Sequence, residues 1–475
     1  MNSNRSSGLI IGMLILVFPF IVWGQPNLTG QKFTGYRGIW FELNQKFPYG
    51  DKYSGGLGTY TAKHIPLAIY APEVDKTFFV YGGTTEADQR HLLCMIGSYD
   101  HRSGMVSRPV VVYDKQGVND PHDDPSLSID DQGYLWVFVS GRGQKRPGFI
   151  FKSEQPFDIS SFVQVLESEM TYPQPWFIEG KGYVYLFTKY TGVRELYFRT
   201  SPDGMNWSED FKLAGIKEKS TERSGHYQVS GRIGNKVATF FNRHPDGNVD
   251  KRTDLYYLQT EDFGKTWTNI HGQIMQLPLE DVHNRAQVVD YQKEGKNVYL
   301  KDLKFDPEGN PIALYITSKG HEPGPANDPR EWRLCRWNGS QWIHSIITTS
   351  DHNYDMGSLI LDGVKWYVVA PTTDGPQKYG TGGEIDIWFS RNKGKKWKLR
   401  RKVTRFSQSN HSYMRSVLYG KAPFQYFWAD GDADHQSISH LYFGDLQGNT
   451  WILPYDMQEA EEKPIKVDLN HPRKP

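Results

Sequence analysis

Residues 122–140 read HDDPSLSIDDQGYLWVFVS, and this stretch decides the fold. It runs from a polar cluster through a short apolar strand and a polar turn into an aromatic strand that ends in polar residues. Strands of this length, separated by turn residues, predict antiparallel hairpins. The same order recurs as PWFIEG and YVYLFTKY (175–190), YQVSGRI and KVATFFN (227–242), LKFDP and IALYITS (303–318), and SLILDG and KWYVVAP (358–371).

The polar clusters that open these units repeat along the chain. Most are about 50–60 residues apart, with one wider step between the fourth and the fifth, which leaves room for about four short strands per unit. The clusters begin at Lys63, His122, Tyr172, His226, Lys301, His352 and His411. We therefore predict an all-β chain folded as a seven-bladed β-propeller. Six or eight blades stay open, because YRGIW (36–40) could complete a blade or begin one.

Three turn motifs support this architecture. Residues 260–267 (TEDFGKTW) match the Asp-box pattern, residues 390–397 (SRNKGKKW) match it with Asn for Asp, and residues 201–207 (SPDGMNW) are a contracted form. In such a hairpin the Asp side chain accepts from turn N–H groups and Gly takes a positive φ, while Trp packs between strands. We assign these motifs a structural role.

Composition narrows the function classes. The 475 residues carry a formal net charge of +1, which argues against a general nucleic-acid binder. Cys94 and Cys335 are the two cysteines of the sequence, so a disulfide framework is excluded. Glycine-rich segments lack the strand–helix context of a nucleotide-binding fingerprint.

The two ends of the chain differ from the repeats. Arg5 followed by the apolar run 8–23 has the layout of a secretory signal peptide cleaved near Gly24, and an uncleaved membrane anchor is the alternative. No Cys follows the run, which argues against a lipoprotein. We predict a signal peptide at 1–24, the propeller at 25–457, a loosely held charged tail at 458–475, and export to the periplasm or medium.

One face of the predicted disc collects unusual side chains. In an antiparallel pair, the start of an inner strand lies beside the end of the strand that follows it. The residues at these ends are His122, Arg142, Tyr172, Gln174, Lys189, Tyr190, His226, Tyr227, Arg243, His244, Lys301, Asp302, Lys319, His321, His352, Tyr354, His411, Tyr413 and Arg415. A cationic, aromatic face suits a carboxylated or sulfated sugar, although a single His at a strand start is more often structural.

Several segments resemble one family. YRGIW, GGLGTYTAKH, NDPHDDPSL, TYPQPW, HYQVS, RTDLYYLQTEDFGKTW, TTSDHNYDMGSL and NHSYMRS look like the bacterial BNR-repeat proteins related to propeller-fold ulvan lyases. The resemblance covers most of the chain. It implies elimination at a uronic acid of a sulfated algal polysaccharide or its oligosaccharides. In that pattern His122 matches the first His, Tyr190 the Tyr and Arg194 the Arg, while Arg142 stands where a second His is expected.

The implied chemistry fits these residue types. Elimination removes the C5 proton, α to a carboxylate, and a cation such as Arg142 or Arg194 would stabilise the aci-carboxylate that forms. His122 is the first candidate base, with His226 and His244 in reserve, and Tyr190 would protonate the leaving oxygen at C4 or act as base. Further substrate contacts are expected from Lys189, Tyr227, Arg243, His352, Tyr354 and His411. A departing sugar makes the enzyme a lyase, and departing water makes it a dehydratase; no organic cofactor is needed.

Three other interpretations remain. A sialidase-type glycoside hydrolase also has Asp-boxes, but the sequence lacks an F-R-I-P segment and such enzymes usually have six blades. A non-catalytic sugar-binding propeller would keep the aromatics and Arg without needing clustered His and Tyr. Asp430, Asp432 and Asp434 beside His435 have oxygen-ligand spacing suited to structural Ca²⁺, although alternating acids in a loop are usually solvated.

Overall fold

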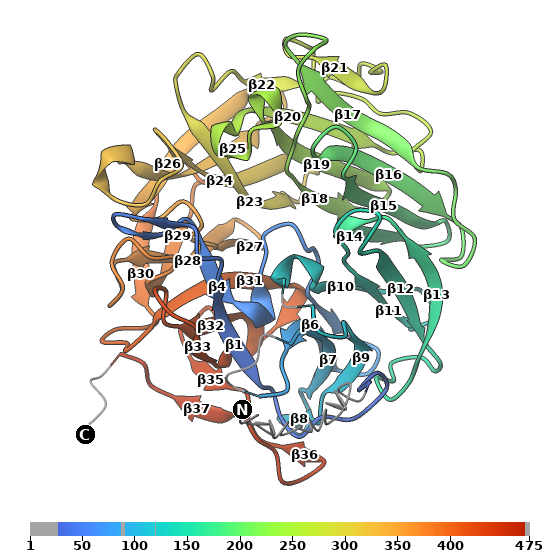
Figure 1. The fold of residues 1–475 in the computed structure, drawn as a ribbon, viewed down its shortest axis with the longest axis vertical. Coiled ribbons are helices and arrows are strands. Elements are labelled where there is room, and N and C mark those ends of the chain that lie inside the picture. Colours follow the sequence, from blue (N-terminus) through green and yellow to red (C-terminus); the bar gives the residue numbers. More distant parts are fainter. Residues whose placement is uncertain (1–26, 87–90, 119, 471–475) are drawn as a thin grey trace, which may run out of the picture.

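The structure is a computed structural model that describes residues 27–86, 91–118 and 120–470 (Figure 1). It is all-β, as predicted. The helices in the described ranges are single 3₁₀ turns, and none of them is long and apolar enough to cross a membrane. They are η1 (Leu57–Thr59), η2 (Pro121–Asp123), η3 (Pro245–Gly247), η4 (Val249–Lys251) and η5 (Pro325–Asn327). The predicted signal peptide lies outside the described residues.

Five separate sheets of four or five strands follow one another along the described chain. Their strands pair antiparallel except β17 with β21, which is parallel. They comprise β10 (Pro125–Ile129), β11 (Leu135–Val139), β12 (Gly148–Ser153) and β13 (Phe162–Ser168); β14 (Thr171–Ile178), β15 (Gly182–Lys189), β16 (Glu195–Ser201), β17 (Phe211–Lys217) and β21 (Leu279–Asp281); β18 (Gln228–Ile233), β19 (Lys236–Arg243), β20 (Thr253–Thr260) and β22 (Gln287–Val289); β23 (Asn297–Phe305), β24 (Pro311–Ser318), β25 (Arg330–Trp337) and β26 (Trp342–Ser350); and β27 (Ser358–Asp362), β28 (Lys365–Thr373), β29 (Glu384–Ser390) and β30 (Lys398–Lys402).

An eleven-stranded sheet joins the two ends of the described chain. A single parallel residue pair, Leu418 with Ile69, connects the half of the sheet that contains β5 to β9 and β36 with the half that contains the other C-terminal strands. Its strands are β5 (Ala68–Ala71), β6 (Lys76–Gly83), β7 (Leu93–Asp100), β8 (Met105–Ser107), β9 (Val110–Asp114), β31 (Asn410–Lys421), β32 (Phe424–Gly431), β34 (Leu441–Gly444), β35 (Thr450–Ile452), β36 (Glu461–Glu462) and β37 (Ile465–Val467).

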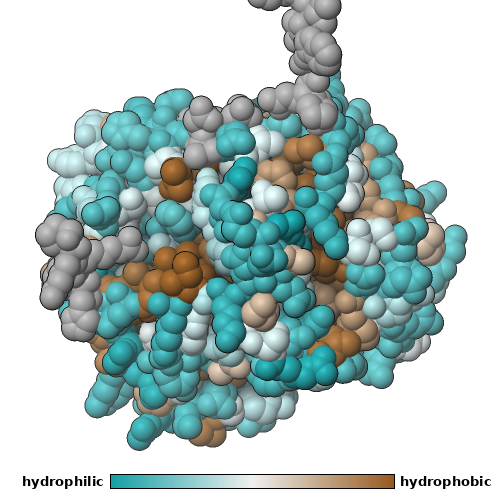
Figure 2. Space-filling view, turned by 90° about the horizontal axis from the view of Figure 1, so that it is seen from below, coloured by the Kyte–Doolittle hydropathy of each residue, from teal (hydrophilic) through white to brown (hydrophobic). Residues whose placement is uncertain are grey.

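The innermost strands of these sheets meet in a closed ring. Each contacts the next, in the order β5, β10, β14, β18, β23, β27 and β31, and β31 pairs again with β5 (Figure 1). Because the sheets pack face to face, β11 (LWVFV) is buried along its whole length, whereas every residue of the outer β13 (FVQVLES) is partly or fully exposed. Figure 2 shows the side of the molecule, where mostly hydrophilic residues surround hollows with hydrophobic floors.

The Asp-box turns have the predicted structural role. Asp262 accepts from the backbone N–H of Thr266 at 2.9 Å, and Asn392 accepts from that of Lys396 at 2.9 Å. Gly264 has φ +82°, where a side chain would be strained, and Trp267 is buried. These hairpins lie away from the cavity described below.

The segment before the first repeat differs from expectation. YRGIW neither opens nor completes one of the larger sheets, because β1 (Gly38–Glu42) forms a small sheet with β33 (Ser437–Ser439) and β4 (Ser54–Gly56). The short hairpin β2 (Lys46–Phe47) and β3 (Gly50–Asp51) follows β1. In Figure 1 this blue segment crosses in front of the ring, so it can reach the central cavity.

The C-terminal tail is not loosely held over its described part, so this expectation is wrong there. β36 pairs with β8, and β37 pairs with β35 at the edge of the eleven-stranded sheet. Leu469 is also buried and packs with the core of the last sheet. The charged composition concealed this because an edge strand with one solvent-facing side can be largely polar.

Candidate active site

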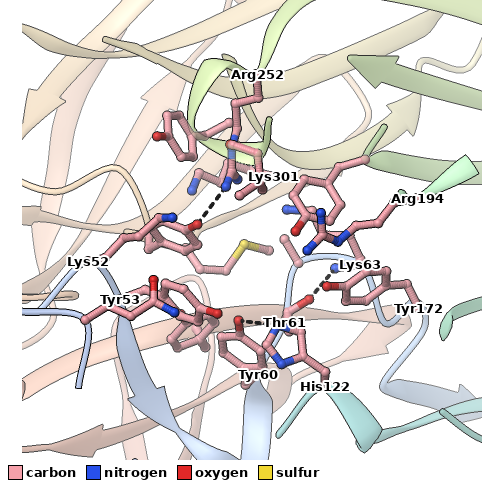
Figure 3. A pocket seen from close by; sticks show the side chains of 18 of the residues that line it. Lys52, Tyr53, Tyr60, Thr61, Lys63, His122, Tyr172, Arg194, Arg252 and Lys301 are labelled. Atoms are coloured by element: carbon pink, nitrogen blue, oxygen red, sulfur yellow. Dashed lines mark hydrogen bonds between the residues drawn. The ribbon is translucent and has the colours of Figure 1, made fainter. Parts of the chain in front are cut away.

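A cavity lies where the inner strands begin, at the centre of the ring (Figure 3). Its wall is made of cationic and tyrosine side chains, as the sequence predicted for this face. The lining residues are Gln45, Lys52, Tyr53, Tyr60, Thr61, Ala62, Lys63, His122, Arg142, Tyr172, Arg194, Tyr227, Val249, Arg252, Tyr299, Lys301, Tyr354, Met356 and Tyr413. No Asp or Glu belongs to this described lining, so the cavity attracts anions.

His122 has the geometry of a neutral base. It lies in η2, whose N-cap Asp120 accepts from the His122 backbone N–H. The Asp120 carboxylate is also 2.5 Å from His122 Nδ1, which places the ring proton on Nδ1 and leaves Nε2 as the acceptor, 3.3 Å from the Tyr60 hydroxyl. Burial lowers the pKa of His122, and Asp120 only partly offsets this effect. The imidazole is therefore neutral at pH 7.

Arg142 connects Asp120 to Tyr190. Its guanidinium donates to Asp120 at 2.5 Å and to the Tyr190 hydroxyl at 3.1 Å. Burial raises the pKa of Tyr190, with Arg142 and Arg194 partly offsetting the rise, so the phenol keeps its proton at pH 7. A guanidinium cannot act as a base, so Arg142 is suited to binding an anion and positioning Tyr190.

Arg194 lies between two tyrosines of neighbouring sheets. Its guanidinium carbon is 5.7 Å from the Tyr190 ring centre and 5.9 Å from that of Tyr227. Its Nε is buried and has no hydrogen-bond partner among the described residues. Burial alone would raise the pKa of Tyr227, but Arg194 and Arg252 outweigh it and lower the pKa. This wall therefore offers the unpartnered Nε donor of Arg194 and a phenol, Tyr227, whose pKa is lowered.

Three further basic side chains line the cavity, Lys63, Arg252 and Lys301, which we call the cation triad. The Arg252 guanidinium donates to the Tyr354 hydroxyl at 2.7 Å and to the Val249 carbonyl at 2.9 Å. Lys301 Nζ donates to the Asn353 carbonyl at 2.8 Å. Figure 3 shows Arg252 and Lys301 together at one end and His122 at the other.

Three of the predicted histidines make hydrogen bonds within the fold and do not line the cavity. Nε2 of His226 accepts from the Ile216 backbone N–H at 3.0 Å and its Nδ1 contacts the Asn242 carbonyl at 2.9 Å, so neither nitrogen is available as a base. His352 Nδ1 accepts from the backbone N–H of Tyr354 at 3.1 Å. His411 Nδ1 accepts from the Trp428 indole at 3.0 Å, and it lines a different pocket. These three assignments as site residues are therefore not supported.

Two predicted cations are also engaged elsewhere. Lys189 pairs with Asp210 at 3.0 Å, and Arg243 is buried between Asp254 at 2.6 Å and Glu218 at 3.0 Å. Neither lines the cavity. Their position at strand ends was correct, but carboxylates on neighbouring segments already neutralise them.

His244 lies behind the cavity wall. Its ring is 4.8 Å from that of Tyr227, and both ring nitrogens are buried without a partner among the described residues. Burial and the nearby Arg252 lower the pKa of His244 well below its ordinary value, so it is neutral. It remains the second candidate base, one layer further from the cavity than His122.

Sequence reasoning missed several lining residues. Tyr53, Tyr60 and Lys63 come from the segment that crosses the ring, and Arg415 holds that segment by donating to the carbonyls of Thr61 and His64. Lys63 opened the first polar cluster, which was a usable signal. Arg252 follows η4 in the wide step between the fourth and fifth clusters, where no periodic pattern points to it.

The candidate calcium loop gathers no ligand set. Among the described residues, no group of three or more His, Cys, Asp or Glu side chains is placed to hold a metal ion. Asp430 instead accepts from the Tyr442 hydroxyl at 2.7 Å and from the backbone N–H of His440 at 2.7 Å. Cys94 and Cys335 are both buried and free.

Comparison with known proteins finds one matching family model and several ulvan lyases among the similar sequences. A family model described as BNR repeat-containing family member matches residues 90–355. An ulvan lyase of Nonlabens ulvanivorans is 24% identical over 259 residues, which is 48% of this chain and 54% of that protein. An ulvan lyase of Pseudoalteromonas sp. (strain PLSV) is 22% identical over 291 residues, 52% of this chain and 58% of that protein. The chain thus spans about half the length of the curated relatives it matches.

A solved structure extends the likeness of the fold. It is a PL25 ulvan lyase bound to -[GlcA(1-4)Rha3S]-, and it superposes with a TM-score of 0.69 at 16% identity. The superposition covers 91% of this chain and 98% of that one. At this identity the likeness concerns the fold, which both proteins share over nearly their whole length.

Proposed function

This chain belongs to the BNR repeat-containing family, and from that membership we propose that it is a carbon–oxygen lyase acting on ulvan or its oligosaccharides. The observation that carries the proposal is the cavity, which a neutral His122 and several arginines line. The protonated Tyr190 is not itself among the lining residues, but its hydroxyl accepts from the lining Arg142 at 3.1 Å. The ulvan lyases among its relatives supply the substrate class. The solved PL25 structure holds a glucuronate linked to a 3-sulfated rhamnose, and we propose the same repeat as substrate here.

Arg194 and Arg142 are proposed to hold the uronate carboxylate. Loss of the C5 proton moves negative charge onto the carboxylate oxygens, so cations at this position bind the transition state more tightly than the ground state. A guanidinium matches a planar carboxylate with two parallel N–H donors. Arg194 has the freer donors, because Arg142 already serves Asp120 and Tyr190.

His122 is proposed to remove the C5 proton, and Tyr190 to protonate the O4 leaving atom. Asp120 favours the tautomer whose Nε2 is unprotonated, with the Tyr60 hydroxyl 3.3 Å away, and it stabilises the imidazolium that forms. The raised pKa of Tyr190 keeps its proton available for transfer to the leaving oxygen. The C4–O4 bond breaks as C4=C5 forms, so the electrons of the C5–H bond become the new π bond. No organic cofactor is required.

The leaving group separates two versions of this reaction. When O4 belongs to the next sugar the chain is cut, and when O4 is the hydroxyl of a non-reducing end water leaves. We test both by incubating the protein with ulvan and with its oligosaccharides. The expected result is ultraviolet absorbance from a double bond conjugated to the carboxylate. Mass spectrometry then distinguishes chain cleavage from loss of water, and saturated products alone would point to a glycoside hydrolase.

The Arg194→Met variant is expected to raise KM about tenfold or more and to lower kcat as well. The side chain keeps its apolar stem but loses the charge-assisted bonds to the carboxylate, which strengthen in the transition state. Steady-state kinetics on ulvan measure both constants. Arg400→Met, on the exposed strand β30, removes the same charge far from the cavity and is the control. Equal kinetics for the two variants would remove Arg194 from the binding site.

The number of blades is a further proposal. We infer that the eleven-stranded sheet represents two blades, because one residue pair joins its two parts. Added to the five separate sheets, this reading supports the seven blades predicted from the repeats. We keep export with a signal peptide at 1–24, and the propeller limits of 25–457, as proposals of the same kind.

A further inference from the structure

The cation triad has no counter-charge of its own. No carboxylate of the described residues pairs with Lys63, Arg252 or Lys301, whereas Lys52 nearby pairs with Asp250. Asp355 is the one acid that acts on Lys301, and burial raises the pKa of Asp355 well above its usual range, which favours its neutral form. The buried Arg252 and Lys301 and the partly buried Lys63 therefore line the cavity without a paired carboxylate.

Such an arrangement is costly unless a ligand completes it. Buried charges in proteins are normally paired, because loss of hydration is otherwise uncompensated. Burial and the neighbouring cations lower the pKa of Lys63 well below its usual range and bring that of Lys301 to about 7. An anion bound beside these amines would favour their charged forms and so oppose both shifts.

The triad is also held in position before any ligand arrives. Arg252 is fixed by the Val249 carbonyl and the Tyr354 hydroxyl, and its guanidinium lies 4.4 Å from the Tyr299 ring centre. Lys301 is fixed by the Asn353 carbonyl. Lys63 Nζ lies 5.0 Å from the Tyr227 ring centre. Pre-positioned donors on three separate segments lower the entropy cost of binding.

The geometry of the donors suits a tetrahedral anion. A planar carboxylate is matched by one guanidinium fork, as proposed for Arg194. Two ammonium point charges and one guanidinium that arrive from different segments suit a group with three terminal oxygens directed apart. Tyr227 lies within 6 Å of both Arg194 and Arg252. One cavity thus offers two anion sites separated by a tyrosine.

We propose that Lys63, Arg252 and Lys301 form a subsite for a sulfate ester on the sugar next to the uronate that is eliminated. This inference rests on the proposed function for the identity of the glycan, and it assigns the triad to the sulfated neighbour instead of to the reacting carboxylate. The subsite would place the uronate with its carboxylate toward Arg194 and its C5 toward His122.

The test measures binding, so it does not depend on turnover. Lys63→Met is made in a His122→Ala background, which prevents cleavage during the measurement. Calorimetry compares a sulfated ulvan oligosaccharide with the same oligosaccharide after desulfation. We expect Lys63→Met to weaken binding of the sulfated ligand about ten- to a hundredfold and to leave binding of the desulfated ligand unchanged. A sulfated oligosaccharide whose carboxylates have been reduced should also bind Lys63→Met more weakly than it binds the parent, because its sulfate is still present.

Controls separate this result from general effects. Lys365→Met removes a charge at the half-exposed turn after β27 and should bind both ligands normally. Thermal unfolding without ligand checks that Lys63→Met keeps the fold. Equal weakening of binding for the two ligands, or no weakening for either, would contradict the subsite. If normal sulfate-dependent binding accompanies an absence of unsaturated product, the proposed reaction fails while the subsite stands.

Discussion

His122→Ala is expected to lower kcat about a hundred- to ten-thousandfold, which is the usual effect of removing a proton-transfer group. The variant loses the Nε2 acceptor that faces the cavity, while Asp120 keeps its bonds to Arg142 and Arg146. The fold should therefore persist, and circular dichroism and thermal unfolding check this. Steady-state rates of double-bond formation on ulvan measure the loss.

Two further histidine variants make the His122 result decisive. His435→Ala, whose side chain is 79% exposed, should keep full activity. His244→Ala should retain most of it, because His244 lies behind Tyr227. If His244→Ala abolishes turnover while His122→Ala leaves it near normal, the base belongs to the fourth repeat.

The pH profile of the wild type follows from the same assignment. A base must be deprotonated, so activity should fall as the pH drops through the pKa of His122. Burial holds that pKa below the ordinary 6.5, so the acid limb of kcat should lie below pH 6.5. An acid limb well above that value would assign it to another group.

Tyr190→Phe is the second variant with a large expected effect, again about a hundred- to ten-thousandfold in kcat. Phenylalanine keeps the ring against Arg194 but removes the hydroxyl that accepts from Arg142 and that would protonate O4. KM should change much less, because the carboxylate contacts of Arg194 remain. Ulvan oligosaccharides with a better leaving group at C4 should recover part of the rate, since they need less help from an acid.

The matched control for Tyr190 is Tyr419→Phe, which removes an exposed hydroxyl from β31 on the outside of the cavity. It should be fully active. Near-normal turnover in Tyr190→Phe would contradict the assignment and direct attention to Tyr227. The lowered pKa of Tyr227, caused by Arg194 and Arg252 in spite of burial, would then make its phenolate the natural candidate.

Arg142 stands where the family pattern has a second histidine, and its contacts differ accordingly. An arginine cannot take a proton as a second histidine could. Here it instead bridges Asp120, which is the partner of the proposed base, and Tyr190, which is the proposed acid. The two proton-transfer groups are thus joined by one cation that also faces the cavity.

The sequence alone was sufficient for the features that depend on local pattern. Alternating short apolar strands and Asp-box turns determined the all-β fold class, because strand period and turn chemistry act over a few residues. The hairpin rule also placed His122 near Arg142, since adjacent antiparallel strands bring their ends together, and the repeat placed Tyr190 at the corresponding end of the next sheet. His122 and Tyr190 remain predictions as catalytic groups until the variants are measured.

Tertiary structure decided which polar side chains at those ends face the cavity. His226 and Arg243 occupy the expected strand ends, yet a backbone N–H and two carboxylates from neighbouring strands and loops engage them. Arg252 reaches the cavity from a segment whose path no periodicity describes. A hydrogen bond or ion pair is decided by which groups meet in space, and segments far apart in the chain meet only when the ring of sheets closes.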